Sequence, residues 1–88
     1  MKALTIPRHG DADVLTFVTD LPKPSPGPGE VLVRVALTGL NRVDLLIRGG
    51  YPGLTIPLPH VGGGDIAGTV AELGDDVAGI ENGARVVV

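Results

Sequence analysis

Glycine and proline interrupt this sequence so regularly that they decide which folds remain open to it. The 88 residues hold 14 glycines and 8 prolines, a quarter of the chain, which is at the edge of the range for disordered sequence. Here they fall between short apolar runs rather than in a single tract. That distribution indicates turns between short strands, and therefore a β-rich fold.

Alternating apolar residues predict where the strands lie. The clearest strand covers residues 30–39, EVLVRVALTG, with four apolar side chains expected on one face: Val31, Val33, Val35 and Leu37. Other strands are predicted at 1–7, 15–21, 65–73 and 85–88. Residues 22–29, PKPSPGPG, favour a stiff extended surface connection, with a proline-recognition ligand as the alternative.

Residues 41–48, NRVDLLIR, change to the period of a helix. The apolar positions form one stripe: Val43, Leu46 and Ile47. Asp44 and Arg48 are an i, i+4 pair on the opposite side, while Asn41 is a good N-cap at the positive end of the helix. One short helix among about five strands indicates a small all-β barrel or sandwich with open edges.

Charge and composition exclude several functional classes. The net charge is −3, acids and bases are interspersed, and only Phe17 and Tyr51 are aromatic, which argues against nucleic-acid binding. No apolar stretch approaches the ~20 residues that span a bilayer, and the N-terminus lacks the apolar core of a signal peptide. With no cysteine there is no disulfide and no thiolate metal site, and a cytoplasmic location is expected.

Several motifs have both a chemical and a structural interpretation. The run HVGGGD at 60–65 suggests a phosphate loop, but a strand rather than a helix is predicted after it, which favours a tight bend. His9 and His60 are weak candidates for a metal site; for His60, a ligand contact is the alternative to a satisfied loop histidine. No Ser-His-Asp arrangement is expected, because the single serine, Ser25, lies in the proline-rich segment.

Four polar candidates remain: Asn41 and Asp44 in the predicted helix, Tyr51 after it, and Asp65 further along the chain. Taken without context, they are a helix cap, a stabiliser of the same helix, a loop aromatic and the start of a strand. The residues alone therefore favour structural roles for all four.

Five segments in register resemble the start of a medium-chain dehydrogenase/reductase, within its GroES-like catalytic domain. The segments are MKAL, PGPGEVLVRV, TGLNRVDLLIRGGYP, PLPHVGGGDIAGTVAELGDDV and NGARVVV. The resemblance implies a mainly β fold, a GroES-like partly open β-barrel with a short helix, as an incomplete domain. The bare apolar strand at the end of the sequence also indicates a piece of something longer.

The resemblance also implies which chemistry is missing. In the zinc alcohol dehydrogenases of this family, a cysteine ligand stands at the position of Asn41, and a histidine ligand and a glutamate stand at those of Gly64 and Asp65. An amide and a bare backbone cannot replace a thiolate and an imidazole. The chain is therefore similar to the zinc-free branch of quinone oxidoreductases and enoyl reductases, and no metal site is expected.

In that branch, hydride passes from NADPH to a quinone or to a double bond conjugated with a carbonyl. By resemblance, Asn41 lies beside the nicotinamide, Asp44 braces the same helix, and Tyr51 orients the substrate carbonyl oxygen. Asn41 and Tyr51 are thus the candidate catalytic residues, and Asn41 and Asp44 are the candidate cofactor-binding residues.

Residues 1–88 are expected to form the N-terminal part of the catalytic domain, because no strand–GxGxxG–helix unit of a Rossmann cofactor domain is present. The isolated chain is expected to be inactive. The complete enzyme is expected to be a homodimer that acts on a small quinone, enone or enoyl substrate, without membrane or nucleic-acid partners. An enoyl reductase module of a fatty-acid or polyketide synthase and a non-catalytic GroES-like interaction module are the alternatives, and NADH or NADPH stays open.

Overall fold

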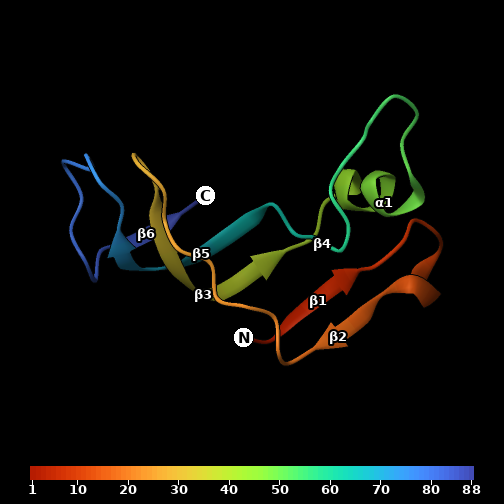
Figure 1. The fold of residues 1–88 in the computed structure, drawn as a ribbon, viewed down its shortest axis with the longest axis horizontal. Coiled ribbons are helices and arrows are strands. Elements are labelled where there is room, and N and C mark those ends of the chain that lie inside the picture. Colours follow the sequence, from red (N-terminus) through yellow and green to blue (C-terminus); the bar gives the residue numbers. More distant parts are fainter. The chain divides into compact units, whose positions relative to one another are not determined.

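A computed structural model describes all of residues 1–88, which divide into two compact units. Unit 1 combines Met1–Pro22 with Leu40–Gly64, and unit 2 combines Lys23–Gly39 with Asp65–Val88. Each unit contains one antiparallel sheet of three strands, and neither sheet closes on itself (Figure 1). The fold is mainly strands with one α-helix, and its sheets are open, which confirms the predicted fold class.

The sheet of unit 1 is short because proline and polar turns limit its strands. Strand β1 (Ala3–Ile6) lies between β2 (Thr16–Val18) and β4 (His60–Val61). β1 ends at Ile6 because the next residue is proline, which has no backbone N–H for the ladder. A 3₁₀ helix at Ala12–Val14 leads into β2.

The strand predicted at 15–21 is shorter and more exposed than its alternation indicated. Only Thr16–Val18 pair with β1, with Phe17 opposite Leu4. Alternation in residues 15–21 predicts a half-buried strand, but Phe17 is 62% exposed, so no buried face forms there. Burial in unit 1 falls instead on Thr5, Ile6 and Val14.

The sheet of unit 2 contains the two longest strands. Its order is β3 (Val31–Gly39), β5 (Asp65–Leu73) and β6 (Arg85–Val87), and Val70 in the central strand is buried. The proline-rich connection that precedes β3 is held by Glu30, whose Oε1 accepts the Gly27 N–H at 2.8 Å. The predicted strands at 30–39, 65–73 and 85–88 are confirmed within one residue at each end.

The prediction that one face of β3 carries Val31, Val33, Val35 and Leu37 is wrong at its last position. The register with β5 shifts between Val35 and Leu37, so that Val35 lies opposite Gly68 and Leu37 opposite Ala67. Neighbouring residues of β5 point to opposite faces, and therefore Val35 and Leu37 do so too. Leu37 is 72% exposed.

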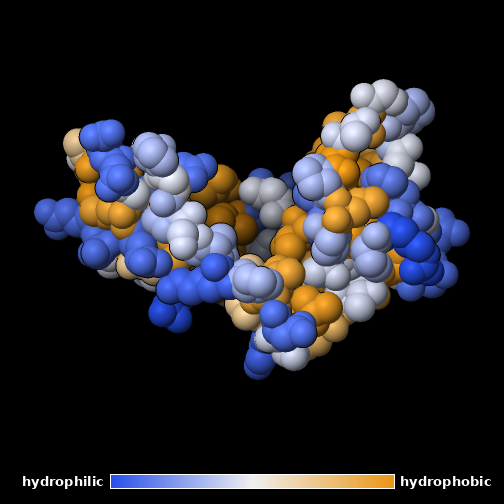
Figure 2. Space-filling view, viewed as in Figure 1, coloured by the Kyte–Doolittle hydropathy of each residue, from blue (hydrophilic) through white to orange (hydrophobic).

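Hydrophobic side chains lie open at the surface of both units (Figure 2). Ile6, Val14 and Val70 are the buried hydrophobic residues, which is a small core for a chain of this length. No helix in the structure combines the length and the apolar character required to cross a membrane.

Candidate functional site

Helix α1 (Arg42–Gly49) begins where the sequence predicted, at Asn41 in unit 1. Asn41 has the extended backbone of an N-cap, and it forms a capping box with Asp44 three residues later. In this box the Asn41 N–H donates to Oδ2 of Asp44 at 2.8 Å. The carboxylate also lies at the positive end of the helix dipole, which favours its charged form.

The second oxygen of Asp44 joins the helix to the glycine run. Oδ1 accepts the N–H of Gly63 at 2.9 Å, so one carboxylate holds backbone amides that are far apart in sequence. Gly63 has a φ of 89°, which a residue with a side chain adopts at a cost. Strand β5 follows at Asp65, and the Gly63 amide is used by Asp44. The run therefore leads from strand β4 to strand β5 and not into a helix, so it lacks the context of a phosphate loop. The structure assigns no turn or bend to residues 62–64, which differs from the predicted tight bend.

The two amides change the acidity of Asp44. Hydrogen bonds from the backbone N–H groups of Asn41 and Gly63 lower the pKa of the Asp44 carboxyl below its ordinary 3.8, and the charge of nearby His60 lowers it further. Partial burial opposes this effect without cancelling it. Asp44 is therefore a charged anchor at neutral pH, placed between α1 and the glycine run.

The predicted pair between Asp44 and Arg48 does not form. Both Asp44 oxygens accept backbone N–H groups, and the ion pair recorded in the structure joins Lys23 to Glu72 in unit 2. Nε of Arg48 is buried without a hydrogen-bond partner. Helix spacing allowed the pair, but the backbone N–H groups of Asn41 and Gly63 occupy the two carboxylate oxygens instead.

The C-terminal end of α1 is held by the turn after β1. Gly50 caps the helix in the left-handed conformation, with a φ of 83°. The carbonyl oxygen of Ile47 lies 2.9 Å from Nδ1 of His9, and the carbonyl oxygen of Arg48 accepts the Gly10 N–H at 2.8 Å. Because a carbonyl oxygen only accepts, Nδ1 of His9 carries the proton. Sequence reasoning missed this role of His9, since nothing local links residues 9 and 47.

Tyr51 follows directly after the helix cap, also in unit 1. Its side chain is 54% exposed, and its carbonyl oxygen accepts the Leu54 N–H at 3.0 Å in a turn. The helix thus has Asn41 at one end and Tyr51 just beyond the other. Asp65 belongs to unit 2, where it pairs with Gly39 and its carbonyl oxygen accepts the Thr38 hydroxyl.

The donors at the zinc positions do not match a zinc site. Asn41 and Gly64 lie in the same unit, and Asp44 joins Asn41 to Gly63, the neighbour of Gly64. An amide and a glycine supply neither thiolate nor imidazole. A Cβ at Gly64 would meet nothing within 4 Å, so the backbone leaves room for a side chain there. No three His, Cys, Asp or Glu residues are grouped to hold a metal ion.

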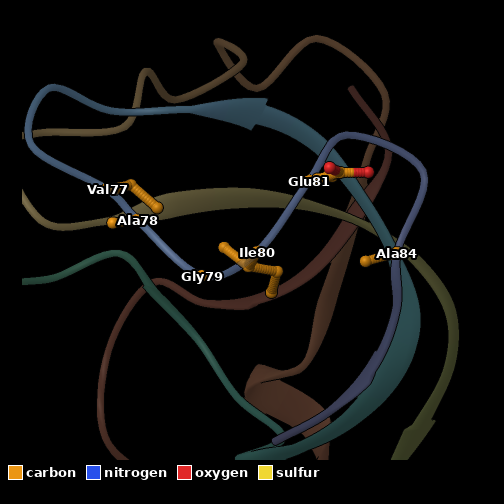
Figure 3. A pocket seen from close by; sticks show the side chains of 6 residues that line it. All are labelled: Val77, Ala78, Gly79, Ile80, Glu81 and Ala84. Carbon is orange, nitrogen blue, oxygen red and sulfur yellow. The ribbon is translucent and has the colours of Figure 1, made fainter.

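Unit 2 contains a hollow whose lining residues lie further along the sequence than all of the candidate site residues. Its lining comes from the loop between β5 and β6, as Figure 3 shows, and consists of Val77, Ala78, Gly79, Ile80, Glu81 and Ala84. Glu81 is the one ionisable group among them. With a single carboxylate as the only ionisable side chain in its lining, the hollow offers no catalytic arrangement.

Comparison with known proteins shows four similarities, to one family, one relative and two solved structures. Residues 27–88 match the family described as the alcohol dehydrogenase GroES-like domain. Rat (Rattus norvegicus) quinone oxidoreductase is 34% identical over 86 residues, which are 98% of this chain and 26% of that protein. A crystal structure of an NAD-dependent alcohol dehydrogenase agrees with a TM-score of 0.91 at 41% identity, over 100% of this chain and 25% of the other.

A mycobacterial protein in complex with NADPH has a similar structure. The TM-score is 0.88 and the identity 38%, over 99% of this chain and 27% of that one. The chain therefore spans about a quarter of the length of the proteins that it matches.

Proposed function

This chain belongs to the alcohol dehydrogenase GroES-like domain family of the medium-chain dehydrogenase/reductases, and on that basis we propose that it is the substrate-side part of a zinc-independent, NADPH-dependent oxidoreductase. The proposed reaction is hydride transfer to a quinone or to a double bond conjugated with a carbonyl. The whole protein would be a cytoplasmic homodimer, and these 88 residues would work together with a Rossmann domain that binds most of the cofactor.

One observation carries the zinc-independent assignment. The corner that Asp44 holds together contains an amide at Asn41 and a bare backbone at Gly64, at positions where a zinc enzyme requires a thiolate and an imidazole. The backbone at Gly64 leaves space for a larger side chain, so crowding does not explain why glycine stands here in place of a histidine ligand. The likeness to a quinone oxidoreductase supports the proposed quinone acceptor.

Each residue has a distinct role in this proposal. NADPH, when bound, supplies the hydride. Asn41 offers an amide that donates and accepts hydrogen bonds beside the nicotinamide. Asp44 acts through Asn41, because both of its oxygens hold backbone amides and fix the start of α1. The Tyr51 phenol donates a hydrogen bond to the substrate carbonyl oxygen and stabilises the charge that develops there.

The experiment uses the complete polypeptide that contains this chain. NADPH oxidation is followed with a quinone acceptor, with and without a chelator, and zinc is measured in the same preparation. We expect quinone-dependent turnover that the chelator leaves unchanged and zinc far below one per chain. Stoichiometric zinc together with chelator-sensitive alcohol oxidation would overturn the proposal, and absence of any turnover would favour a non-catalytic interaction module.

Variants at Asn41 test the site itself. Asn41→Ser keeps a side chain suited to an N-cap but removes the amide, so we expect weaker NADPH binding or slower turnover with little loss of stability. Asn82→Ala, in an exposed turn of unit 2, is the matched control. If Asn41→Ser has the same kinetic constants as the control, Asn41 is not part of the site.

A further inference from the structure

We propose that His9 is a positioning residue for Tyr51, acting through the C-terminal end of α1. The inference rests on the proposed function, in which Tyr51 orients the substrate carbonyl oxygen. His9 itself touches neither substrate nor cofactor in this proposal. It sets where the chain leaves the helix, and therefore where the phenol lies.

The helix requires such an anchor because packing does not supply one. No residue of α1 is buried, so its apolar stripe contributes little to holding it in place. Its position within unit 1 depends on hydrogen bonds at its two ends. Asp44 and Gly63 hold the start, next to Asn41, while His9 and Gly10 hold the end, next to Tyr51.

The contact of His9 with the end of the helix is both polar and steric. Nδ1–H donates to the Ile47 carbonyl oxygen at 2.9 Å, and the same oxygen accepts the Gly50 N–H at 3.2 Å, so His9 adds a second bond to the carbonyl that closes the helix. The ring also lies against Gly50, where an added Cβ would come within 3.3 Å of His9 Cγ. Gly50 is in the left-handed conformation that turns the chain toward Tyr51.

The chemistry of the contact suggests matched variants. An N–H at the Nδ1 position of the ring is required, and the amide nitrogen of asparagine occupies nearly the same place on a side chain. Glutamine places its amide one carbon further out, near the Nε2 position. His9→Asn should therefore preserve the bond to Ile47, and His9→Gln should lose it while keeping a polar side chain of similar size.

The kinetic test uses the complete polypeptide and a quinone acceptor. We expect His9→Gln to lower kcat/KM for the quinone about fivefold, the effect of one hydrogen bond. We expect His9→Asn to stay near wild type and the KM for NADPH to be unchanged, because Asn41 lies at the other end of α1. In a Tyr51→Phe background, His9→Gln should add no further loss.

Two kinetic outcomes would overturn the inference. One is equal impairment of His9→Asn and His9→Gln, since the Nδ1 bond would then be irrelevant. The other is a double variant whose fold-loss in kcat/KM equals the product of the losses in His9→Gln and Tyr51→Phe. Independent effects of that kind would show that His9 does not act through Tyr51.

Amide hydrogen exchange separates this inference from the proposed function. The Leu54 N–H donates to the Tyr51 carbonyl oxygen and reports on that turn, whereas the Gly63 N–H reports on the Asp44 end. We expect His9→Gln to speed exchange at Leu54 and not at Gly63. If the polypeptide reduces no quinone, the proposed function fails while this readout still decides the role of His9; unchanged exchange at Leu54 overturns it.

Discussion

At the scale of the single residue, Asp44 is the most informative side chain in the structure. A capping aspartate is common, and its local role follows from its spacing to Asn41. Its second hydrogen bond, from the Gly63 N–H, connects α1 with the glycine run. That bond spans 19 residues and has no local signal in the sequence.

We expect Asp44→Asn to destabilise the protein by about 1–2 kcal/mol, the usual effect of losing a charge-assisted hydrogen bond. The new amide would turn an N–H toward the N–H of either Asn41 or Gly63, so only one bond survives. Urea unfolding measures the change. Asp11→Asn is the matched control, because Asp11 precedes the 3₁₀ helix without a side-chain hydrogen bond to it; an equal loss there would contradict the prediction.

The lowered pKa of Asp44 predicts how this loss depends on pH. Its folded-state pKa lies below the ordinary 3.8, so the ionised carboxylate stabilises the fold above that pH. As the pH falls through the folded-state pKa, that stabilisation disappears. We therefore expect the difference in unfolding free energy between wild type and Asp44→Asn to be full at pH 7 and to shrink below about pH 4. A difference that stays constant down to pH 2.5 would contradict the assignment.

At the scale of the element, the sequence predicted what local pattern determines. The strands at 30–39 and 65–73 and the start of α1 at Asn41 all follow from periodicity or capping. The register shift at Ala36 could not be predicted in this way. It is a β-bulge, in which two residues of β3 lie opposite one residue of β5, so it depends on how the two strands pair. The role of His9 could not be predicted for the same reason, because the carbonyl group that it contacts belongs to Ile47, 38 residues away.

The bulged pairing of β3 with β5 makes Gly68 a sensitive position. A Cβ there would overlap the carbonyl oxygen of Arg34 and crowd the Val33 side chain. We expect Gly68→Ala to cost more than about 2 kcal/mol, since backbone must move to relieve the overlap. Gly49→Ala is the control: it ends α1 with open space around it and should raise stability by about 0.5–1 kcal/mol. Thermal unfolding distinguishes the two, and a mild effect at Gly68 would show that the strands separate easily.

At the scale of the whole molecule, the balance between buried and exposed apolar surface is unusual. Ile6, Val14 and Val70 form the buried hydrophobic set, while large hydrophobic residues are exposed in both units. In unit 2, the register places Leu37 and Val87 on either side of Ala67 in one row across the sheet, and they are 72% and 84% exposed. Side chains that share a row and a face present a continuous apolar strip to solvent.

This strip predicts how the 88-residue chain behaves alone. We expect it to self-associate as its concentration rises and to bind a hydrophobic dye, because apolar rows and free strand edges attract one another. Leu37→Lys should reduce both effects with little change in unfolding free energy, since the side chain is already exposed. Leu45→Lys, on the exposed surface of α1 in unit 1, adds the same charge elsewhere. Sedimentation velocity compares them; equal suppression by both variants would assign the association to net charge rather than to the strip.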